Sequence, residues 1–161
     1  MNVPNGQKTT AMRAVIQRVS SASVEVQGAT VSRIGGGLLC LIGLCASDTP
    51  RDAAYLARKI LNARLWPSEG KPWDKSVAAL ELEVLCVSQF TLLGRLNGNK
   101  PDFSRAMPPA QAREAYEAFL ATLRSAYRAD RVLDGEFGAA MQVSLVNDGP
   151  VTWTLDSADA R

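Results

Sequence analysis

The chain has 161 residues, of which 47% are hydrophobic and 21% charged, and this size and composition are typical of one globular domain with its own core. Its 18 basic and 16 acidic residues leave a net charge of +2, so overall charge does not indicate a nucleic-acid partner, and an RNA-binding surface would need clustered cations. The chain contains no histidine, which excludes Ser-His-Asp and Cys-His nucleophiles, histidine general bases and histidine-ligated metal sites.

The N-terminal part of the chain predicts an extension followed by strands. Residues 1–11 are polar and aperiodic, and we interpret them as a disordered extension. From Arg13 the sequence alternates as in a β-strand, and SVEVQGATVSRI predicts a hairpin that turns at Gln27-Gly28. Leu38–Leu44 is almost entirely apolar, which predicts a strand buried in the middle of the sheet.

The next segment carries the signals of a helix, a loop and a strand. Asp48 or Thr49 caps a helix whose apolar residues repeat at helical spacing, and we expect this helix to end near Leu65. The stretch Trp66–Ser76 contains two prolines and a glycine and is interpreted as a loop. Leu82–Phe90 then resumes as an apolar strand.

The C-terminal half predicts a second helix and several short strands. A long loop over Leu93–Pro109 precedes a helix with one apolar face, which we expect to lie on the sheet. Short strands are expected at Arg131–Leu133, Met141–Val146 and Val151–Leu155. About six to eight strands and two helices without regular alternation predict an α+β fold, in which a mainly antiparallel, barrel-like sheet packs with two helices. We assign this single domain to 12–156 and a short tail to 157–161.

The cysteines and the apolar runs indicate the compartment. Cys40, Cys45 and Cys86 form no CxxC pair and lie in apolar runs, where a thiol packs as a small hydrophobe. Their odd number, with no N-glycosylation acceptor and no signal peptide, predicts a reducing, cytoplasmic setting. The longest apolar run, Gly37–Ala46, is about half the length of a membrane helix, so we expect a soluble protein.

Three polar segments are candidates for chemistry, and the first is Ser88-Gln89-Phe90-Thr91-Leu92. Here a strand ends in polar residues, and backbone N–H groups released from a sheet can point at a ligand. The same residues also suit a simple strand end with alternating side chains. If Ser88 were a nucleophile, its base would have to be a lysine or a carboxylate, because no histidine is present.

The second segment is Asn147–Thr152, which lies between two predicted strands. Its Asn-Asp-Gly-Pro composition favours a plain hairpin connection on local grounds. The functional alternative is a cis bond between Gly149 and Pro150, which would point two successive carbonyl oxygens in one direction.

The third segment is Arg95–Arg105, where Lys100 and Phe103 lie between the two arginines. Cations bind phosphate and an aromatic ring stacks on a base, a combination that suits the single-stranded end of an RNA. A solvated loop is equally compatible with this composition.

Five short motifs follow one another along the chain: Met12-Arg-Ala-Val-Ile-Gln-Arg-Val, Ser88-Gln-Phe-Thr-Leu, Lys100-Pro-Asp-Phe-Ser-Arg, Phe137-Gly-Ala-Ala-Met and Asn147-Asp-Gly-Pro-Val-Thr. In this order they closely resemble the D-aminoacyl-tRNA deacylase family, over essentially all of Met12–Leu155. The resemblance implies a homodimeric hydrolase that cleaves the ester between a D-amino acid and the terminal adenosine of tRNA. It also implies action on glycine mischarged on tRNA, rejection of L-aminoacyl esters and no cofactor.

The resemblance also implies roles for particular residues. The first family motif places catalysis at Ser88, Gln89, Phe90 and Thr91. The second implies a cis Gly149-Pro150 bond and a loop that enters the site of the partner subunit. The substrate-binding residues that it implies are Arg18, which holds that loop, Phe137 at the adenosine pocket, and Met141, Asn147, Gly149, Pro150 and Thr152.

This assignment accounts for chemistry without histidine. An aminoacyl ester is already activated, so backbone N–H groups of Phe90 and Thr91 that stabilise the oxyanion are expected to suffice, one such donor contributing about 10²- to 10³-fold. We expect the substrate's own 2′-hydroxyl to activate water. We also expect the carbonyls of Gly149 and Pro150 to exclude an L side chain by a steric clash.

Two other functions compete with this assignment. One is a non-catalytic RNA-binding module that uses the loop Arg95–Arg105. The other is a serine hydrolase in which Ser88 and Lys100 form a dyad.

Overall fold

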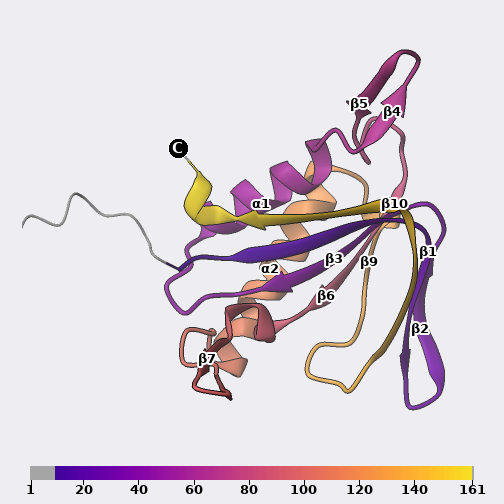
Figure 1. The fold of residues 1–161 in the computed structure, drawn as a ribbon. Helices are drawn as coiled ribbons and strands as arrows, with labels where there is room; N and C mark the ends of the chain where they lie inside the picture. The colour runs from indigo at the N-terminus through magenta and orange to yellow at the C-terminus, as the bar shows by residue number, and fades with distance from the viewer. Residues whose placement is uncertain (1–9, 161) are drawn as a thin grey trace, which may run out of the picture.

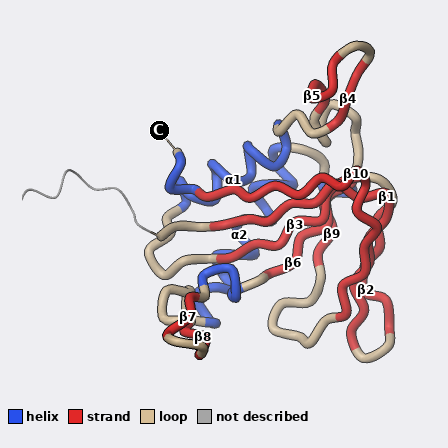
Figure 2. Tube along the Cα trace, viewed as in Figure 1, coloured by secondary structure: helices blue, strands red, loops and turns tan. Residues whose placement is uncertain are grey.

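The computed structural model describes residues 10–160, which form a mixed six-stranded sheet with two helices on one of its faces (Figures 1 and 2). Five strands follow in the order β10-β1-β3-β6-β9, and β2 pairs with β1 outside this path. The sheet consists of β1 (Arg13–Val26), β2 (Ala29–Ile34), β3 (Gly37–Gly43), β6 (Glu83–Ser88), β9 (Val132–Asp134) and β10 (Gln142–Asp156). The long strands β1 and β10 bend together, so that the sheet is nearly closed into a barrel (Figure 1). The α+β prediction is therefore confirmed.

The sheet combines antiparallel and parallel pairs. β1 runs antiparallel to β2, β3 and β10, whereas β3 pairs with β6 and β6 with β9 in parallel. The apolar strand β3 lies in the middle, as its composition predicts. The ends of β3 and β6 therefore lie side by side, and the chain leaves β6 at Ser88 beside Ile42.

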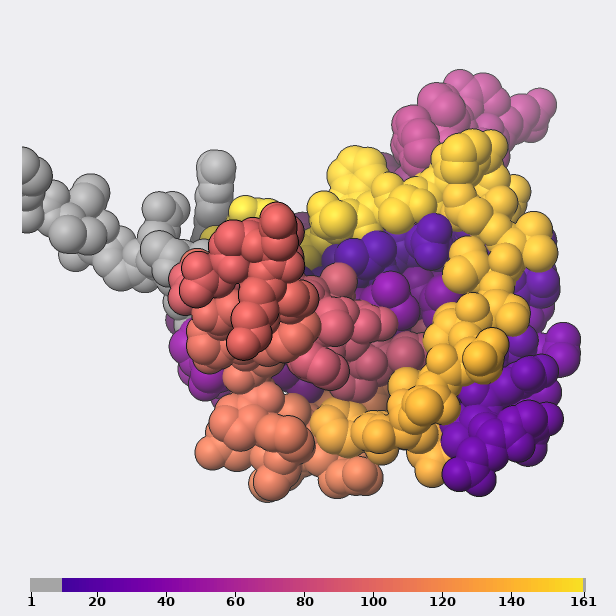
Figure 3. Space-filling view, turned by 60° about the horizontal axis from the view of Figure 1, so that its bottom comes forward, coloured from indigo at the N-terminus to yellow at the C-terminus, as the bar shows by residue number. Residues whose placement is uncertain are grey.

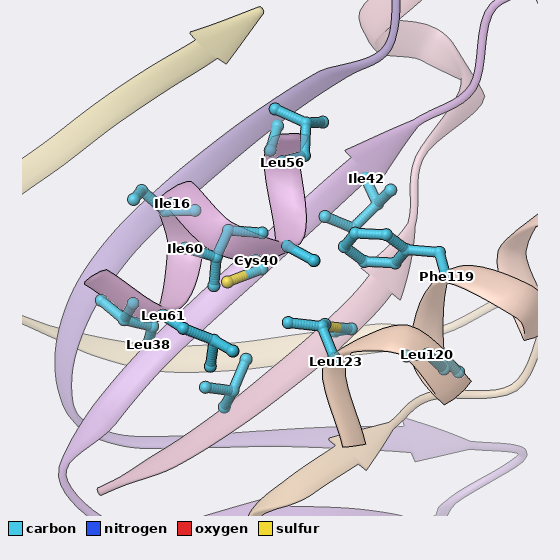
Figure 4. Packing of buried hydrophobic residues seen from close by; sticks show 14 of the residues in the cluster. Ile16, Leu38, Cys40, Ile42, Leu56, Ile60, Leu61, Phe119, Leu120 and Leu123 are labelled. Atoms are coloured by element: carbon cyan, nitrogen blue, oxygen red, sulfur yellow. The ribbon is translucent and has the colours of Figure 1, made fainter. Parts of the chain in front are cut away.

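Two helices connect the parallel strands and bury their apolar faces on the sheet. α1 (Pro50–Asn62) begins after Thr49, whose backbone N–H donates to a carboxylate oxygen of Asp52 at 2.8 Å, and it ends three residues before the predicted Leu65. α2 (Pro109–Ala126) begins at the predicted position. Figure 4 shows Ile60 of α1 beside Cys40 of β3, and Phe119 of α2 beside Ile42 of the same strand. Each large side chain fully buried there contributes about 1.5–3 kcal/mol.

Two segments that were predicted as loops contain small hairpins. β4 (Trp66–Ser68) pairs with β5 (Lys71–Lys75) in a hairpin that projects from the domain (Figure 2). β7 (Arg95–Asn97) pairs with β8 (Lys100–Asp102) within the predicted loop Leu93–Pro109. Both loop predictions were wrong in this respect. Each hairpin has very short strands around a glycine turn, and segments with so many prolines and glycines are typical of loops, so local composition does not indicate the strand pairing.

The ends of the described chain pack against the domain. Residues 1–9 of the predicted extension, and Arg161, lie outside the described residues, whereas Ala11 is fully buried. The segment assigned as a tail begins with the short turn η3 (Ser157–Asp159), and the buried Ser157 hydroxyl donates to the Asp52 carboxylate at 2.8 Å. A further short turn, η2 (Ala129–Arg131), precedes β9.

Cys40, Cys45 and Cys86 are buried with free thiols, as predicted. Burial raises the pKa of the Cys40 thiol, so it remains protonated and packs as an apolar group. Neither helix within residues 10–160 is long and apolar enough to cross a membrane.

Candidate active site

A cavity of about 820 Å³ opens beside the end of β6, within the size range of small-ligand sites. Figure 3 views this side of the molecule, where the coral chain around residues 95–102 and the orange chain around 137–145 frame the end of β6. The cavity is lined by Leu44, Val87, Ser88, Gln89, Phe90, Phe103, Ser104, Ala106, Met107, Pro108, Pro109, Ala112, Phe137, Gly138, Ala139, Met141 and Val143. No residue in this lining has an ionisable side chain, which holds for the part of the chain that the structure describes.

The first predicted motif forms the strand-end wall of this cavity. After Ser88, the Gln89 N–H continues the sheet by donating to the Ile42 carbonyl at 2.7 Å, and the chain then turns into η1 (Phe90–Leu93). The Gln89 side-chain amide donates to the Thr91 hydroxyl at 2.5 Å. Ser88, Gln89 and Phe90 line the cavity, whereas Thr91 contributes to η1 and holds Gln89.

Phe90 lines the cavity with a largely exposed side chain. Its side chain is 55% exposed, and its ring packs edge-on against Phe103 with 5.0 Å between the centroids. The turn η1 itself rests on the sheet, because Leu93 is fully buried against Gly43 of β3. As the first residues of a helical turn, Phe90 and Thr91 have backbone N–H groups that the turn does not use.

The predicted residues Phe137 and Met141 lie on the opposite wall of the cavity. The Phe137 ring packs on Tyr116 of α2 at a centroid distance of 5.8 Å. The Tyr116 hydroxyl donates in turn to the Asp134 carboxylate at 2.5 Å. Burial raises the pKa of Asp134, and the hydrogen bond from Tyr116 partly opposes this shift. The hydrogen bond to Asp134 thus fixes Tyr116, on which the Phe137 ring packs.

The second predicted motif is not a hairpin connection, so that interpretation was wrong. Asn147–Thr152 lies inside the single long strand β10, which spans both predicted C-terminal strands. In the pairing of β10 with β1, Asn147 lies opposite Val19 and Thr152 lies opposite Gln17. The four residues Asp148–Val151 therefore face the single residue Arg18 and bulge out beside it. The bond between Gly149 and Pro150 is cis, which agrees with the alternative that the sequence left open.

Side chains of β1 and β10 hold this bulge. The Arg18 guanidinium donates to the Asp148 carbonyl at 3.0 Å and to the Leu65 carbonyl at 2.6 Å, and it lies 3.4 Å from the Asp148 carboxylate. The Asn147 amide donates to the carbonyls of Arg18 and Val151 at 3.0 and 2.9 Å. Gln17 adds a hydrogen bond to the Thr152 hydroxyl at 3.2 Å. The ion pair of Asp148 was not foreseen, since nothing local links it to a residue 130 positions away.

The structure therefore divides the predicted site residues into two groups. Ser88, Gln89, Phe90, Phe137 and Met141 line the cavity, and Thr91 supports it. The residues of the second group lie outside the cavity lining, with Gly149 and Pro150 exposed at the surface; this group comprises Arg18, Asn147, Gly149, Pro150 and Thr152.

The cationic segment Arg95–Arg105 lies at the edge of this region. Arg95 pairs with Asp102 across the β7–β8 hairpin at 3.5 Å, and hydrogen bonding from Ser104 lowers the pKa of Asp102. Lys100 lines a second, smaller cavity of about 290 Å³, and the lining of the main cavity does not include it. Residues 10–160 contain no hydrogen bond between Ser88 and Lys100, so the structure does not assemble a dyad.

Sequence reasoning missed most of the apolar wall of the cavity. Leu44, Met107 and Ala112 belong to segments whose patterns indicate only core packing, and nothing local distinguishes them. The described residues contain no group of three His, Cys, Asp or Glu side chains that could hold a metal ion.

Comparison with known proteins gives consistent results. A family model described as D-Tyr-tRNA(Tyr) deacylase matches residues 15–156. The chain is 55% identical over 150 residues to a D-aminoacyl-tRNA deacylase of Drosophila melanogaster, covering 93% of this chain and 95% of the relative. A solved structure titled c-Myc DNA Unwinding Element Binding Protein is 50% identical, with a TM-score of 0.86 over 89% of this chain and 97% of the other. A probable eukaryotic D-amino acid tRNA deacylase shares the fold with a TM-score of 0.77 at 17% identity, covering 90% of this chain and 98% of the other.

Proposed function

The chain belongs to the D-Tyr-tRNA(Tyr) deacylase family, and on this basis we propose that it hydrolyses the ester of D-aminoacyl-tRNA to free D-amino acid and tRNA. We include glycine mischarged on tRNA among the substrates, and we propose that L-aminoacyl esters are rejected. Translation quality control takes place in the cytoplasm, and the three free, buried thiols suit that reducing compartment.

The observation that supports the mechanism best is that none of the described residues lining the cavity has an ionisable side chain. A cavity walled in this way supplies no general acid or base, so the proton transfers must involve the substrate or water. The 2′-hydroxyl of the terminal ribose lies next to the scissile ester and is available to orient or activate the attacking water. The protein then contributes position and the stabilisation of charge.

We assign stabilisation of the oxyanion to the backbone N–H groups of Phe90 and Thr91. These groups stand at the start of η1, and the sheet fixes η1 through Gln89 and Leu93. Fixed donors need no reorganisation during the reaction, and each is typically worth about 10²- to 10³-fold in rate. Water attacks the ester carbonyl, the tetrahedral intermediate collapses with loss of the ribose oxygen, and the proton of the water passes to that oxygen.

The test of this function is a time course of amino-acid release from matched D- and L-aminoacyl-tRNA. Release of the D-amino acid far above the buffer rate, with much slower release of the L-amino acid, is expected. A Ser88→Ala variant should keep most of the activity, and a serine-directed probe should not label the protein. A stoichiometric burst or loss of all activity in Ser88→Ala would favour a serine nucleophile, and binding of tRNA without ester loss would favour a binding module.

We further propose that the protein acts as a homodimer in which Gly149 and Pro150 complete the cavity of the partner subunit. Both residues are exposed and fixed by Arg18, yet neither lines the cavity of its own chain. Exposed apolar side chains on the same strand, among them Val146 and Trp153, offer a surface for a second copy. In the partner's cavity the two carbonyl oxygens would bind the substrate ammonium and block an L side chain.

Complementation tests this arrangement directly. Gly149→Ala disrupts the bulge, because Gly149 has φ of +143° and a Cβ there would lie 2.7 Å from the Val151 nitrogen. Ala139→Trp fills the cavity. If the bulge acts in the partner's site, mixing the two inactive chains gives heterodimers with one intact site and restores about a quarter of the activity. No recovery, despite heterodimer formation, would show that each chain uses its own bulge.

A further inference from the structure

Arg113 occupies an unusual position behind the cavity wall. It lies on the exposed face of α2, and its guanidinium carbon stands 4.9 Å from the centroid of the Phe137 ring. The same guanidinium donates to the Phe137 carbonyl at 3.4 Å. A Cβ at Gly138, the next cavity residue, would lie 3.7 Å from its terminal nitrogen. Arg113 therefore contacts the segment that forms this wall from outside.

Phe137 is held between two side chains of α2. The buried Tyr116 packs on its ring from the core side, and Arg113, three residues earlier on the same helix, approaches it from the solvent side. Residues at this spacing share one face of a helix, so both contacts come from one rigid element. A cation over an aromatic ring adds a modest attraction to this packing. Arg113 thus positions Phe137 without lining the cavity itself.

The contacts with Phe137 leave most of the guanidinium unused. An arginine carries five N–H donors in a planar fork, and the hydrogen bond to Phe137 takes up one of its terminal nitrogens. Across residues 10–160, no carboxylate forms an ion pair with Arg113. A full positive charge with donors to spare therefore stands 4.9 Å from the ring of Phe137, which belongs to a cavity lining that, among the described residues, contains no charged side chain.

We propose that Arg113 binds the 5′-phosphate of the terminal adenosine of the substrate. This inference rests on the proposed function, and it places the adenosine of the substrate in the main cavity, where the Phe137 ring forms part of the wall. The 5′-phosphate is the anion nearest to that nucleoside in the substrate. A guanidinium group can donate two parallel N–H···O hydrogen bonds to the oxygens of a phosphate. Arg113 then links two parts of the substrate, since it fixes the aromatic wall for the nucleoside and binds the phosphate that joins it to the rest of the tRNA.

Two small substrates separate this contact from every other part of the site. One is adenosine carrying a D-amino acid as the ester of its ribose, and the other is the same compound with a 5′-phosphate. Arg113→Gln should raise KM for the phosphorylated compound about 10- to 150-fold, the range of a charge-assisted hydrogen bond, and raise KM for the nucleoside only a few-fold through the lost contact with Phe137. Arg113→Lys, which keeps the charge, should recover part of the difference.

Arg58→Gln is the matched control. Arg58 stacks on Tyr55 of α1 with 5.6 Å between its guanidinium carbon and the ring centroid, and the main cavity does not include it. It should change KM for neither compound. On whole D-aminoacyl-tRNA, Arg113→Gln should also lower the slope of log KM against log salt by about one unit, as loss of one phosphate contact requires.

The outcomes distinguish failure of this inference from failure of the function. If the unsubstituted protein releases D-amino acid from none of the three substrates, the proposed function is wrong. If it is active but Arg113→Gln leaves the KM ratio of the two small substrates unchanged, the phosphate contact is wrong. Equal losses on both compounds would overturn it too, because they would show that Arg113 acts through Phe137 alone.

Discussion

Adding a single methyl group at Gly43 should displace η1 and slow the reaction. Gly43 is the last residue of β3, and a Cβ built there lies 2.6 Å from Leu93 Cδ2, 2.8 Å from Leu92 Cβ and 3.1 Å from the Gln89 carbonyl oxygen. Real Cβ atoms essentially never approach within 3.0 Å, and ordinary contact begins at 3.4 Å. Leu93 Cδ2 is the end of a side chain that can rotate, whereas Leu92 Cβ is fixed to the backbone, so the turn must move by roughly 0.6 Å to accept alanine.

This displacement has consequences for both stability and rate. Overpacking of this kind costs about 1–3 kcal/mol, which corresponds to a fall in Tm of about 2–12 °C for a domain of this size. A shift of about 1 Å in a catalytic element lowers the rate by up to about 100-fold. We expect Gly43→Ala to lose about 10- to 100-fold in kcat/KM for D-aminoacyl-tRNA, measured well below its Tm.

Gly36→Ala provides the control for this experiment. Gly36 lies just before the same strand, and the nearest atom to a Cβ there is the Val19 carbonyl oxygen at 4.0 Å. This variant should keep the activity and Tm of the unsubstituted protein. If Gly43→Ala is as active as Gly36→Ala, then the position of η1 does not limit the reaction, and the assignment of the oxyanion donors to that turn loses its basis.

Three further substitutions test contacts around the site. Arg13→Met removes the hydrogen bond that the guanidinium donates to the Leu92 carbonyl at 3.0 Å, so kcat should fall several-fold and a thermal melt should show a loss of about 1 kcal/mol. Arg18→Lys loses the fork that binds two carbonyls, and deacylation by the variant should fall while its far-UV spectrum stays unchanged. Tyr116→Phe should lower the free energy of unfolding, measured with a denaturant, by about 1–3 kcal/mol at pH 7 and by less at pH 3. The hydroxyl stabilises ionised Asp134, so its contribution is present at neutral pH and is lost as the pH falls through the pKa of that carboxyl.

The parts of the fold that follow local patterns could be predicted from the sequence. Hydrophobic periodicity, helix caps and turn-forming residues are signals that lie within a few consecutive residues. They predicted the turn at Gln27-Gly28, the apolar strand β3 and both helices. The local pattern of the first motif also suits a simple strand end, and the resemblance of the whole chain to a family singled out Ser88, Gln89 and Phe90, which line the cavity.

The second motif shows why the rest could not be predicted. Local composition at Asn147–Pro150 favours a turn between two strands, and yet β10 runs through it without a break. The reason is distant in sequence, since Arg18 and the bulged pairing with β1 hold these residues in place. Arg113 escaped notice for a similar reason, because its importance depends on Phe137, which is 24 residues away in the chain.

The strand β1 holds both motifs in position. Arg13 on one face of this strand binds η1 through Leu92, and Arg18, an odd number of residues later and therefore on the opposite face, binds the bulge that carries Gly149. One rigid strand thus holds both η1 beside the cavity and the bulge that carries Gly149. In the homodimer that we propose, this arrangement would repeat, and the bulge of each copy would complete the cavity of the other. A mechanism without acid-base side chains depends on such rigidity, because the positions of main-chain atoms determine its selectivity between D- and L-aminoacyl esters.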